Sequence, residues 1–338
     1  MPRLFHRKEH GRLARYLASQ GPIDSLIILV DILKQTKFLR GKAEGNQVVI
    51  GCSGDIRHLP SACMAARMTG VPFAWMVFDD YVARENKWRR VLARMIWSLA
   101  KRRIGCYIAT NEYLALEAPR SGANPPHIVR NPLPQWRVPL NDAKARSPAI
   151  IIYAGSIYEA NLDSLIRLIA AIDTEEMDVE LLIVTPQSTE ALAMKGVRGS
   201  RVRVIGPMEE SGIGALLSQA SILFLPLAFD SPFPEVIRTA SPGKMAEYLN
   251  SGIPILAHVP SSSYVAWFLN QHECGLVIDT LDVAHLKKGL LTLLEDENIR
   301  SSMIERQLQA ALLFDLALNQ KELIGCLDSI AKSKTTKR

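Results

Sequence analysis

The stretch AIIIYAGSIYEANLDSLIRLIAAI, residues 149–172, decides the fold class of this 338-residue chain. Its first six residues form an apolar run that ends at Gly155, a pattern typical of a buried strand. Asn161 then precedes a segment with helical periodicity, and we expect its side chain to cap that helix. The apolar positions of the helix are Leu162, Leu165, Ile166, Ile169 and Ile172. The stretch therefore predicts one strand followed by one helix.

The same alternation continues along the rest of the second half. Further strands are predicted at Val179–Val184, Val202–Ile205, Ile222–Leu227, Ile253–Ala257 and Gly275–Ile278. Helices are predicted between them at Thr189–Lys195, Gly212–Ala220, Pro242–Asn250 and Ser263–Asn270. Strands and helices at this spacing form right-handed βαβ units, with a parallel sheet covered on both faces. Ligands of such sheets bind at the carboxyl ends of the strands.

The first half repeats this pattern less completely. A helix with Asp24 as its cap carries Ile27, Val30 and Leu33 on one stripe. The strands that follow are predicted at Val48–Gly51, Phe73–Phe78, Gly105–Ala109 and His127–Arg130. The predicted linker consists of residues 131–134 and then 138–148, which are rich in proline and polar residues. We therefore predict an α/β protein with two Rossmann-like domains, residues 1–138 and 139–314, followed by a C-terminal helix and basic tail at 315–338.

Composition narrows the class of protein. The hydrophobic fraction of 48% is that of a globular chain. Apolar runs are far shorter than the roughly 20 residues that a membrane span needs, and the first residues do not resemble a signal peptide, which favours a cytoplasmic protein. The five cysteines are scattered without a CxxC pair, so we expect reduced thiols. No metal site is predicted, because only His6 and His10 have helical spacing, within a basic segment.

Charge is distributed unevenly along the chain. Residues 1–140 hold 22 Lys and Arg against 10 Asp and Glu, a net charge of +12, whereas the remainder carries −6. Many of these cations lie in Arg84–Arg103, where apolar residues, including Trp88 and Trp97, alternate with them. Such a basic amphipathic helix can lie on an anionic membrane surface, or it can be a solvated face over an ordinary core. Nucleic acid is not predicted as a partner, because no nucleic-acid module accompanies the charge.

The segment SPGKMAEYLNSGIP, residues 241–254, holds the best candidate site. Ser241 is expected to cap a helix that has Pro242 at its first position. The free N–H groups of that helix end favour an anion, and Gly243 lets a phosphate approach the backbone. Lys244 adds a full positive charge, and Glu247 lies one turn further on the same face. Together they predict a nucleotide clamp, although a capped helix with a surface ion pair would have the same sequence.

Residues 150–300 resemble the donor domain of the family 4 (group 1) glycosyltransferases, which have the GT-B fold. The stretches that carry the resemblance are IIYAGS (151–156), NLDSL (161–165), VIGP (204–207), LLSQASILFLP (216–226), KMAEYLNSGIPI (244–255) and GLV (275–277). The resemblance implies two domains around a cleft. It also implies that Glu247 binds the donor ribose, that Gly155 and Ser156 face the donor phosphates, and that Thr185 lines the nucleotide pocket. Transfer would retain the anomeric configuration and would need neither a bound metal nor a cofactor beyond the nucleotide-sugar donor.

The chain departs from the family pattern at three points. Thr239 stands where the family has a first glutamate that contacts the donor sugar, and Glu235 is out of register. The arginine and lysine that often hold the phosphates after the first donor-domain strand have no clear match, so Lys244 would take over part of that role. The usual N-terminal strand and glycine-rich loop are not found before Val48–Gly51, so we expect a shortened acceptor domain.

Asp79 and Asp80 follow a predicted strand of the first half. They are candidates to accept a proton from an acceptor hydroxyl, or they cap the next helix.

The prediction is therefore a hexosyltransferase of polysaccharide or glycoconjugate synthesis, peripheral at the inner face of a membrane. Its acceptor is a saccharide, a lipid-linked intermediate or a small molecule. The alternatives are a degenerate donor-binding subunit and a nucleotide-sugar 2-epimerase. The candidate catalytic residues are Asp79, Asp80 and Glu247, and the candidate donor-binding residues are Gly155, Ser156, Thr185, Ser241, Gly243, Lys244 and Glu247.

Overall fold

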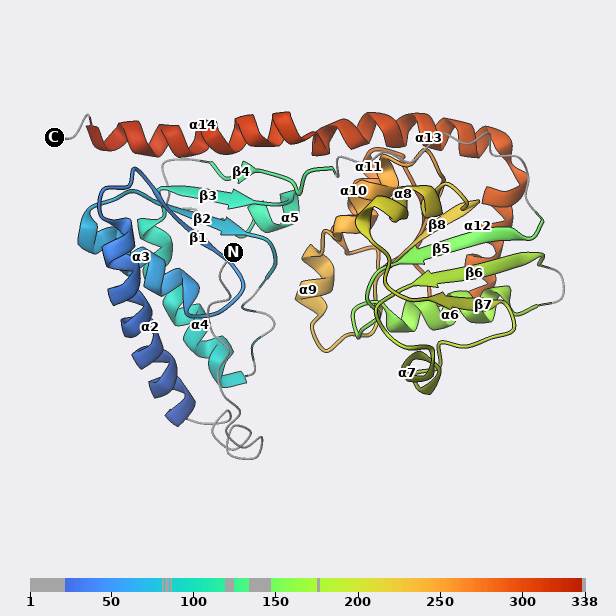
Figure 1. Cartoon of the computed structure of the whole chain (residues 1–338), viewed down its shortest axis with the longest axis horizontal. Helices are drawn as coiled ribbons and strands as arrows, with labels where there is room; N and C mark the ends of the chain where they lie inside the picture. Colours follow the sequence, from blue (N-terminus) through green and yellow to red (C-terminus); the bar gives the residue numbers. More distant parts are fainter. Residues whose placement is uncertain are drawn as a thin grey trace. The chain divides into compact units, whose positions relative to one another are not determined.

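The computed structural model describes residues 22–80, 82, 85, 87–118, 125–133, 147–174 and 177–335. These residues divide into two compact units (Figure 1). Unit 1 contains the residues up to Ala109, Glu117–His127 and those from Ile324 onward, and unit 2 contains Thr110–Leu116 and Ile128–Leu323. The predicted boundary at residue 138 and the histidines His6 and His10 lie outside the described residues.

Unit 1 is a small sheet covered by helices. The strand order is β1-β2-β3-β4, and the β1–β2 and β2–β3 pairs are parallel. Helix α3 packs on β1 and β2 and contacts α2 on one side and α4 on the other (Figure 1). The four strands predicted for the first half are confirmed, and none of their ends differs from the predicted residue by more than two positions. The elements are α2 (Pro22–Ala43), β1 (Val49–Cys52), α3 (His58–Thr69), β2 (Phe73–Val77), α4 (Lys87–Ala100), η1 (Lys101–Arg103), β3 (Cys106–Ala109) and β4 (His127–Ile128).

Helix α2 differs from its prediction in where it begins and in which stripe it buries. It begins at Pro22, so Asp24 lies inside its first turn. Ile28 and Ile32 are buried, whereas the predicted stripe of Ile27, Val30 and Leu33 is exposed. The Ser61 hydroxyl of α3 donates a hydrogen bond to the Ile32 carbonyl, which marks the packed side of α2. Because α2 is apolar around most of its circumference, periodicity alone does not identify the buried face.

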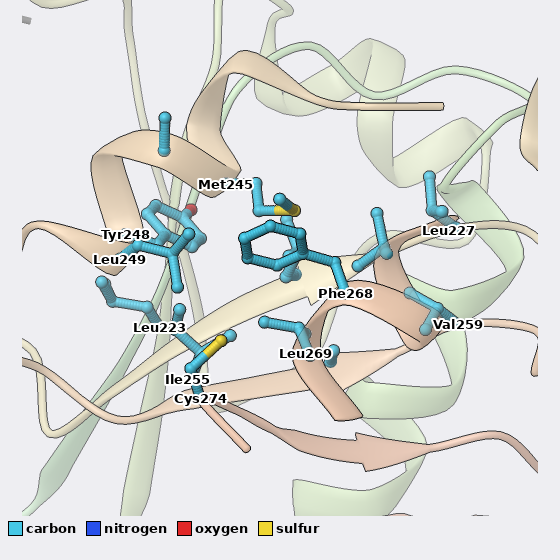
Figure 2. Packing of buried hydrophobic residues seen from close by; sticks show 14 of the residues in the cluster. Leu223, Leu227, Met245, Tyr248, Leu249, Ile255, Val259, Phe268, Leu269 and Cys274 are labelled. Carbon is cyan, nitrogen blue, oxygen red and sulfur yellow. The ribbon is translucent and has the colours of Figure 1, made fainter. Parts of the chain in front are cut away.

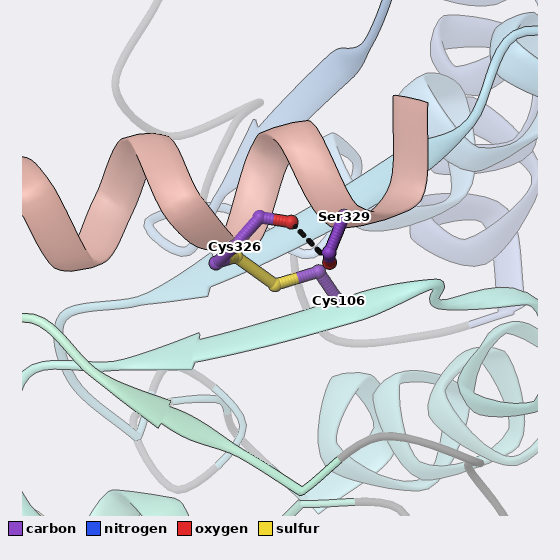
Figure 3. The surroundings of a disulfide bond; sticks show 3 residues. All are labelled: Cys106, Cys326 and Ser329. Carbon is purple, nitrogen blue, oxygen red and sulfur yellow. Dashed lines mark hydrogen bonds between the residues drawn. A yellow bond between two sulfur atoms is a disulfide. The ribbon is translucent and has the colours of Figure 1, made fainter. Parts of the chain in front are cut away.

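A disulfide joins Cys106 of β3 to Cys326 of the C-terminal helix α14 (Leu316–Thr335), as Figure 3 shows. The prediction of reduced thiols is therefore wrong for this pair, although Cys52, Cys63 and Cys274 are free. The two cysteines are 220 residues apart in the sequence, and their Cα atoms lie 6.7 Å apart. Only the packing of α14 on β3 brings them together, so their spacing along the chain contains no sign of the bond.

Unit 2 is built on a six-stranded parallel sheet in the order β10-β9-β8-β5-β6-β7. Strand β5 pairs with β6 on one side and with β8 on the other, so the strand order reverses at β5. The strands are β5 (Ala149–Ala154), β6 (Val179–Val184), β7 (Val202–Ile205), β8 (Ile222–Pro226), β9 (Ile255–His258) and β10 (Leu276–Ile278). The predicted parallel α/β sheet is confirmed, and three of these strands have the predicted bounds.

Apolar helices cover both faces of this sheet. On one face, Tyr248 of α10 and Phe268 of α11 pack over Leu223 and Ile255 of the sheet (Figure 2). On the other face, α6 buries its leucines against β5 and β6, and α12 packs on β9, β10 and α6. The helices of unit 2 are α5 (Glu112–Ala115), α6 (Leu162–Ile172), α7 (Thr189–Met194), α8 (Glu210–Leu217), α9 (Pro234–Thr239), α10 (Gly243–Leu249), α11 (Tyr264–Gln271), α12 (Val283–Glu295), α13 (Glu297–Ala311) and η2 (Leu312–Phe314).

Candidate functional site

The topology of unit 2 places its candidate site at the carboxyl end of β5. A ligand of an open parallel sheet binds where the strand order reverses, because the loops on the two sides of that point turn away from each other. In unit 2 this point lies between β5 and β8. The loop after β5 begins with Gly155 and Ser156, both of which are predicted donor-binding residues.

Lys244 of α10 reaches the end of β5. Its Nζ donates a hydrogen bond of 2.9 Å to the Tyr153 hydroxyl and lies 4.2 Å from the centre of the Tyr153 ring. The side chain is half-buried, and loss of hydration lowers its pKa to about 8, although the negative charge of Glu247 acts in the opposite direction. Lys244 is therefore a cation held against an aromatic face at the carboxyl end of the sheet.

Gly155 is the residue that makes room for this cation. A Cβ atom at this position would lie 2.6 Å from Lys244 Nζ, and the backbone has a φ of +144°, which side chains rarely adopt. The Gly155 N–H donates to the Val184 carbonyl of β6, which fixes the turn at the end of β5. The sequence predicted Gly155 as a phosphate-facing residue, and the structure places it directly against Lys244.

The loop after β5 is held by Tyr153 and Asn161. The Tyr153 hydroxyl donates to the Ser156 carbonyl, while Asn161 Nδ2 donates both to that hydroxyl and to the same carbonyl. Asn161 Oδ1 accepts from the Tyr158 N–H, so this side chain is committed to the loop and does not cap α6, contrary to prediction. Burial raises the pKa of the Tyr153 hydroxyl, which therefore stays protonated and can donate. A lone tyrosine in an otherwise aliphatic strand is the sequence signal for this role.

Helix α10 begins one residue later than predicted. Pro242 is at the N-cap position, Gly243 is the first helical residue, and no side chain caps the helix, so Ser241 is not the cap. Gly243 is exposed, and a Cβ there would have nothing within 4 Å. The helix is only seven residues long. Its dipole is correspondingly weak, so the positive charge of the site comes mainly from Lys244.

Glu247 and Tyr248 follow one turn after Lys244. Tyr248 is fully buried, and its hydroxyl accepts a hydrogen bond of 3.1 Å from the Ala154 N–H of β5. This bond fixes the register of α10 against β5 and thereby the height of Lys244 along the strand. Glu247 is half-buried. Its negative charge raises the pKa values of Lys244 and Tyr248, although burial has the larger influence on each of these pKa values.

Thr185 lies at the end of β6, but its side chain is turned toward its own loop. It is buried, and its hydroxyl donates to Gln187 Oε1. Gln187 Nε2 in turn donates to the Ile157 carbonyl, which ties the loop after β6 to the loop after β5. Thr185 thus supports the β5 loop through Gln187, a residue that sequence reasoning missed.

The position of the missing family glutamate is occupied by a structural residue. Thr239 is buried at the end of α9, and its hydroxyl donates to the Glu235 carbonyl. The Glu235 carboxylate is exposed and accepts from Arg238 Nε at 2.8 Å. Glu235, the nearby glutamate that is out of register, therefore forms an ion pair with Arg238.

A second group that the sequence did not reveal connects three strand ends. The Asp163 carboxylate at the start of α6 accepts from the Phe229 N–H after β8. Ser164 lies 2.7 Å from Nδ1 of His258 at the end of β9, and Nε2 of that ring donates to the Thr280 carbonyl after β10. Because a carbonyl can only accept, Nε2 carries the proton and Nδ1 accepts from Ser164. Burial lowers the pKa of His258, so the ring is a neutral connector.

Asp79 and Asp80 belong to unit 1, where they follow β2. The Ser53 hydroxyl, after β1, lies 3.4 Å from Asp79 Oδ1 and accepts from the Phe78 N–H. The next helix, α4, begins only at Lys87, so Asp79 and Asp80 are too far along the chain to be its cap. That alternative is therefore removed, and both carboxylates lie at the carboxyl edge of the unit 1 sheet.

Asp55, the third acid of this region, is neutralised by an arginine. Arg57 donates from Nε and Nη2 to the two oxygens of Asp55, at 2.7 and 2.6 Å, and from Nη1 to Asp31. Desolvation raises the pKa of Asp55, but the hydrogen bonds and charge of Arg57 outweigh it, so the net pKa is lowered. A carboxylate in such a bidentate pair is a poor general acid or base.

Among the described residues, one group has the composition of a metal site. The ligand atoms of Cys106, His127 and Cys326 lie within 4.8 Å of one another in unit 1. The two sulfur atoms are bonded to each other, so neither is a thiolate available to a metal in this structure.

Comparisons with known proteins agree with the architecture. Residues 148–296 match the family described as Glycosyl transferases group 1. A glycosyltransferase from Rickettsia africae ESF-5 superposes with a TM-score of 0.64 at 13% identity, over 96% of this chain and 89% of that one. Sucrose-phosphate synthase from Thermosynechococcus elongatus gives 0.66 at 14% identity, over 93% and 82%. Anabaena HepE in complex with UDP and glucose gives 0.64 at 14%, over 87% and 81%. No curated protein sequence matches significantly.

These matches confirm the resemblance at the level of the group 1 glycosyl transferases and of the GT-B type of fold. The matched residues extend from just before β5 to the segment between α12 and α13, so they contain Gly155, Lys244 and Glu247. Membership of family 4 in particular stays a prediction.

Proposed function

We propose that this chain, whose residues 148–296 match the group 1 glycosyl transferases, moves a sugar from a nucleotide-diphosphate sugar to an acceptor hydroxyl. The observation that carries the proposal is the position of Lys244 against Gly155 where the strand order of unit 2 reverses. A cation beside a side-chain-free backbone is an arrangement that can bind a diphosphate.

In the proposed reaction, Lys244 binds the diphosphate and stabilises the negative charge that it gains when the sugar leaves. Gly155, Ser156 and Gly243 let the phosphates approach the backbone, and Glu247 binds the ribose hydroxyls. The Tyr153 hydroxyl holds Lys244 ready in the unliganded protein. Because Lys244 supplies a positive charge at the leaving group, we propose that transfer is independent of metal, and the family resemblance suggests retention of configuration.

On the acceptor side we propose Asp79 or Asp80 as the group that receives the proton of the acceptor hydroxyl. Both are half-buried at the end of β2, beside Ser53. The acceptor is a saccharide, a lipid-linked intermediate or a small molecule, in polysaccharide or glycoconjugate synthesis. We place the reaction at an anionic membrane surface, because the charge of +12 on residues 1–140 favours such a surface. No described helix is long and apolar enough to cross a bilayer.

One alternative is favoured by a specific observation. Thr239 replaces the glutamate that contacts the donor sugar, and Glu235 is paired with Arg238. Both observations fit a subunit that binds the donor without catalysing transfer. A 2-epimerase would need several acids and bases, and Asp55, Asp79 and Asp80 are the only candidates. This alternative loses support, because Asp55 is held in an ion pair with Arg57 and would not serve as an acid or base.

The first test is calorimetric titration of the full chain with UDP and with GDP. We expect one of them to bind, and we expect Lys244→Ala and Glu247→Ala each to weaken binding by about tenfold or more, which corresponds to about 1.4 kcal/mol. Lys195→Ala is the matched control, because Lys195 is an exposed lysine of the same unit. If a folded protein binds neither nucleotide, the proposal of a donor site for a UDP-sugar or a GDP-sugar is wrong. Slow hydrolysis of a bound donor would separate an active transferase from a degenerate subunit.

A further inference from the structure

Two helices of unit 1 present apolar side chains to solvent in regular stripes. On α4 these are Trp88, Val91, Met95 and Leu99, at helical spacing along one side, with Trp88 66% and Leu99 75% exposed. The opposite side of α4, with Ala93 and Ile96, is buried. The stripe is therefore additional to the core-facing side of the helix.

Helix α2 repeats this arrangement. Leu26, Leu29, Val30 and Leu33 lie on one side of its first half, with Leu26 62% and Leu33 60% exposed, while Ile28 and Ile32 face the interior. Both helices contact α3, which packs on β1 and β2 (Figure 1). Within the described part of unit 1, the helices thus have two exposed apolar stripes, and exposed apolar surface of this extent marks an interaction site.

The charges beside the stripes identify the partner. Helix α4 and the following η1 contain no acidic residue, and Arg94, Arg102 and Arg103 are exposed beside the stripe. On α2, the exposed Lys34 and Lys37 follow the apolar half of the helix. Apolar side chains between cations are suited to the boundary between headgroups and acyl chains, where long basic side chains bind lipid phosphates.

We propose that α2 and α4 together form a docking surface for an anionic lipid bilayer. The apolar stripes of both helices enter the headgroup region, and the cations of Arg94, Arg102, Arg103, Lys34 and Lys37 bind headgroup phosphates. This surface would hold the protein at the membrane where we propose that the reaction takes place. The inference rests on that proposed location but not on the donor site of unit 2.

The test is co-sedimentation of the full chain with vesicles of phosphatidylcholine alone and of phosphatidylcholine mixed with phosphatidylglycerol. We expect the partition coefficient to be at least about tenfold higher for the mixture and to fall as salt rises. The double variants Trp88→Glu/Met95→Glu and Leu26→Glu/Leu33→Glu should each lower binding to the mixture by about tenfold or more. The matched control is Met194→Glu, because Met194 of α7 in unit 2 is 85% exposed.

A second measurement keeps the test valid if a variant is unstable. Trp88 fluorescence should shift to shorter wavelength on anionic vesicles, and Trp88→Phe should lose that shift while still sedimenting. Equal binding to both vesicle types, undiminished binding of both double variants, or a loss confined to one helix would overturn the proposal. The proposal would also be overturned if the wild type self-associated without binding vesicles and the double variants abolished that self-association. Nucleotide titration of the same variants tests the donor site separately, because a failed donor site leaves vesicle binding unchanged.

Discussion

Lys244 makes the donor site sensitive to pH at the scale of a single residue. With a pKa of about 8, its ammonium group is mostly charged at pH 7 and mostly neutral at pH 9. We expect the dissociation constant of the bound nucleoside diphosphate to rise by about tenfold between these pH values, because the neutral amine no longer attracts phosphate. Calorimetric titrations at a series of pH values measure this change.

Lys244→Arg is the matched variant for this prediction, because an arginine stays charged throughout the range. Its affinity should vary little between pH 7 and 9, whatever its absolute value. Identical pH profiles for the wild type and Lys244→Arg would mean that some other group titrates.

Gly155 and Gly243 allow a second prediction at the same scale. Gly155→Ala would place a Cβ 2.6 Å from Lys244 Nζ on a backbone with positive φ, so we expect a loss of about 1–3 kcal/mol in the free energy of unfolding, together with weaker nucleotide binding. Gly243→Ala meets nothing within 4 Å and should keep or slightly increase stability.

The two glycine variants therefore separate folding from binding. Urea unfolding measures the first property and nucleotide titration the second. If Gly155→Ala were as stable as the wild type, the packing of Lys244 against the β5 loop would be looser than the structure shows. If Gly243→Ala left affinity unchanged, the phosphates would not approach α10 at that residue.

At the scale of elements, the disulfide fixes α14 to the unit 1 sheet. Besides the bond between Cys106 and Cys326, Ile330 of the same helix packs against Gly105 (Figure 3 shows the surroundings of the bond). The bond joins cysteines that are 220 residues apart and therefore restricts the unfolded chain. We expect Cys326→Ser to lower the free energy of unfolding by about 2–5 kcal/mol. Urea unfolding with and without a reducing agent measures the effect.

Cys52→Ser is the control for this prediction, because Cys52 is a free and exposed thiol. The wild type under reducing conditions should behave like Cys326→Ser, and the two treatments should not add. If reduction left the stability of the wild type unchanged, packing alone would hold α14 on β3.

At the scale of the whole molecule, the two units should respond differently to the nucleotide. Gly155, Lys244 and Glu247 all belong to unit 2, so bound nucleotide stabilises that unit directly. At a concentration of 100 times the dissociation constant, the expected gain is about 2.7 kcal/mol. Hydrogen exchange should show greater added protection for the amides of β5 and β8 than for those of β1 and β2, and Lys244→Ala should abolish the difference. Protection confined to unit 1 would place the nucleotide elsewhere.

The sequence alone was sufficient to predict the parallel sheet of unit 2 and the residues at its carboxyl edge. Ala149–Ala154, Val179–Val184 and Val202–Ile205 have the predicted bounds, because a buried parallel strand is a continuous apolar run between turn residues. Lys244 was predicted from a local signal, a basic residue at a helix start, whereas the phosphate-facing role of Gly155 was implied by the family resemblance. Helix α10 begins one residue later than predicted, and no side chain caps it.

Tertiary packing decided what no local signal could encode. The hydrogen bond from Lys244 to Tyr153 joins residues 91 apart, and the disulfide joins residues 220 apart, so both depend on which elements become neighbours. The buried side of α2 was predicted wrongly, because an apolar helix offers several stripes and only α3 selects one of them. Local pattern thus determined the strands, and together with the family resemblance it supplied the candidate site residues. Packing determined which cation faces which glycine, which thiols pair and which apolar stripes remain in solvent.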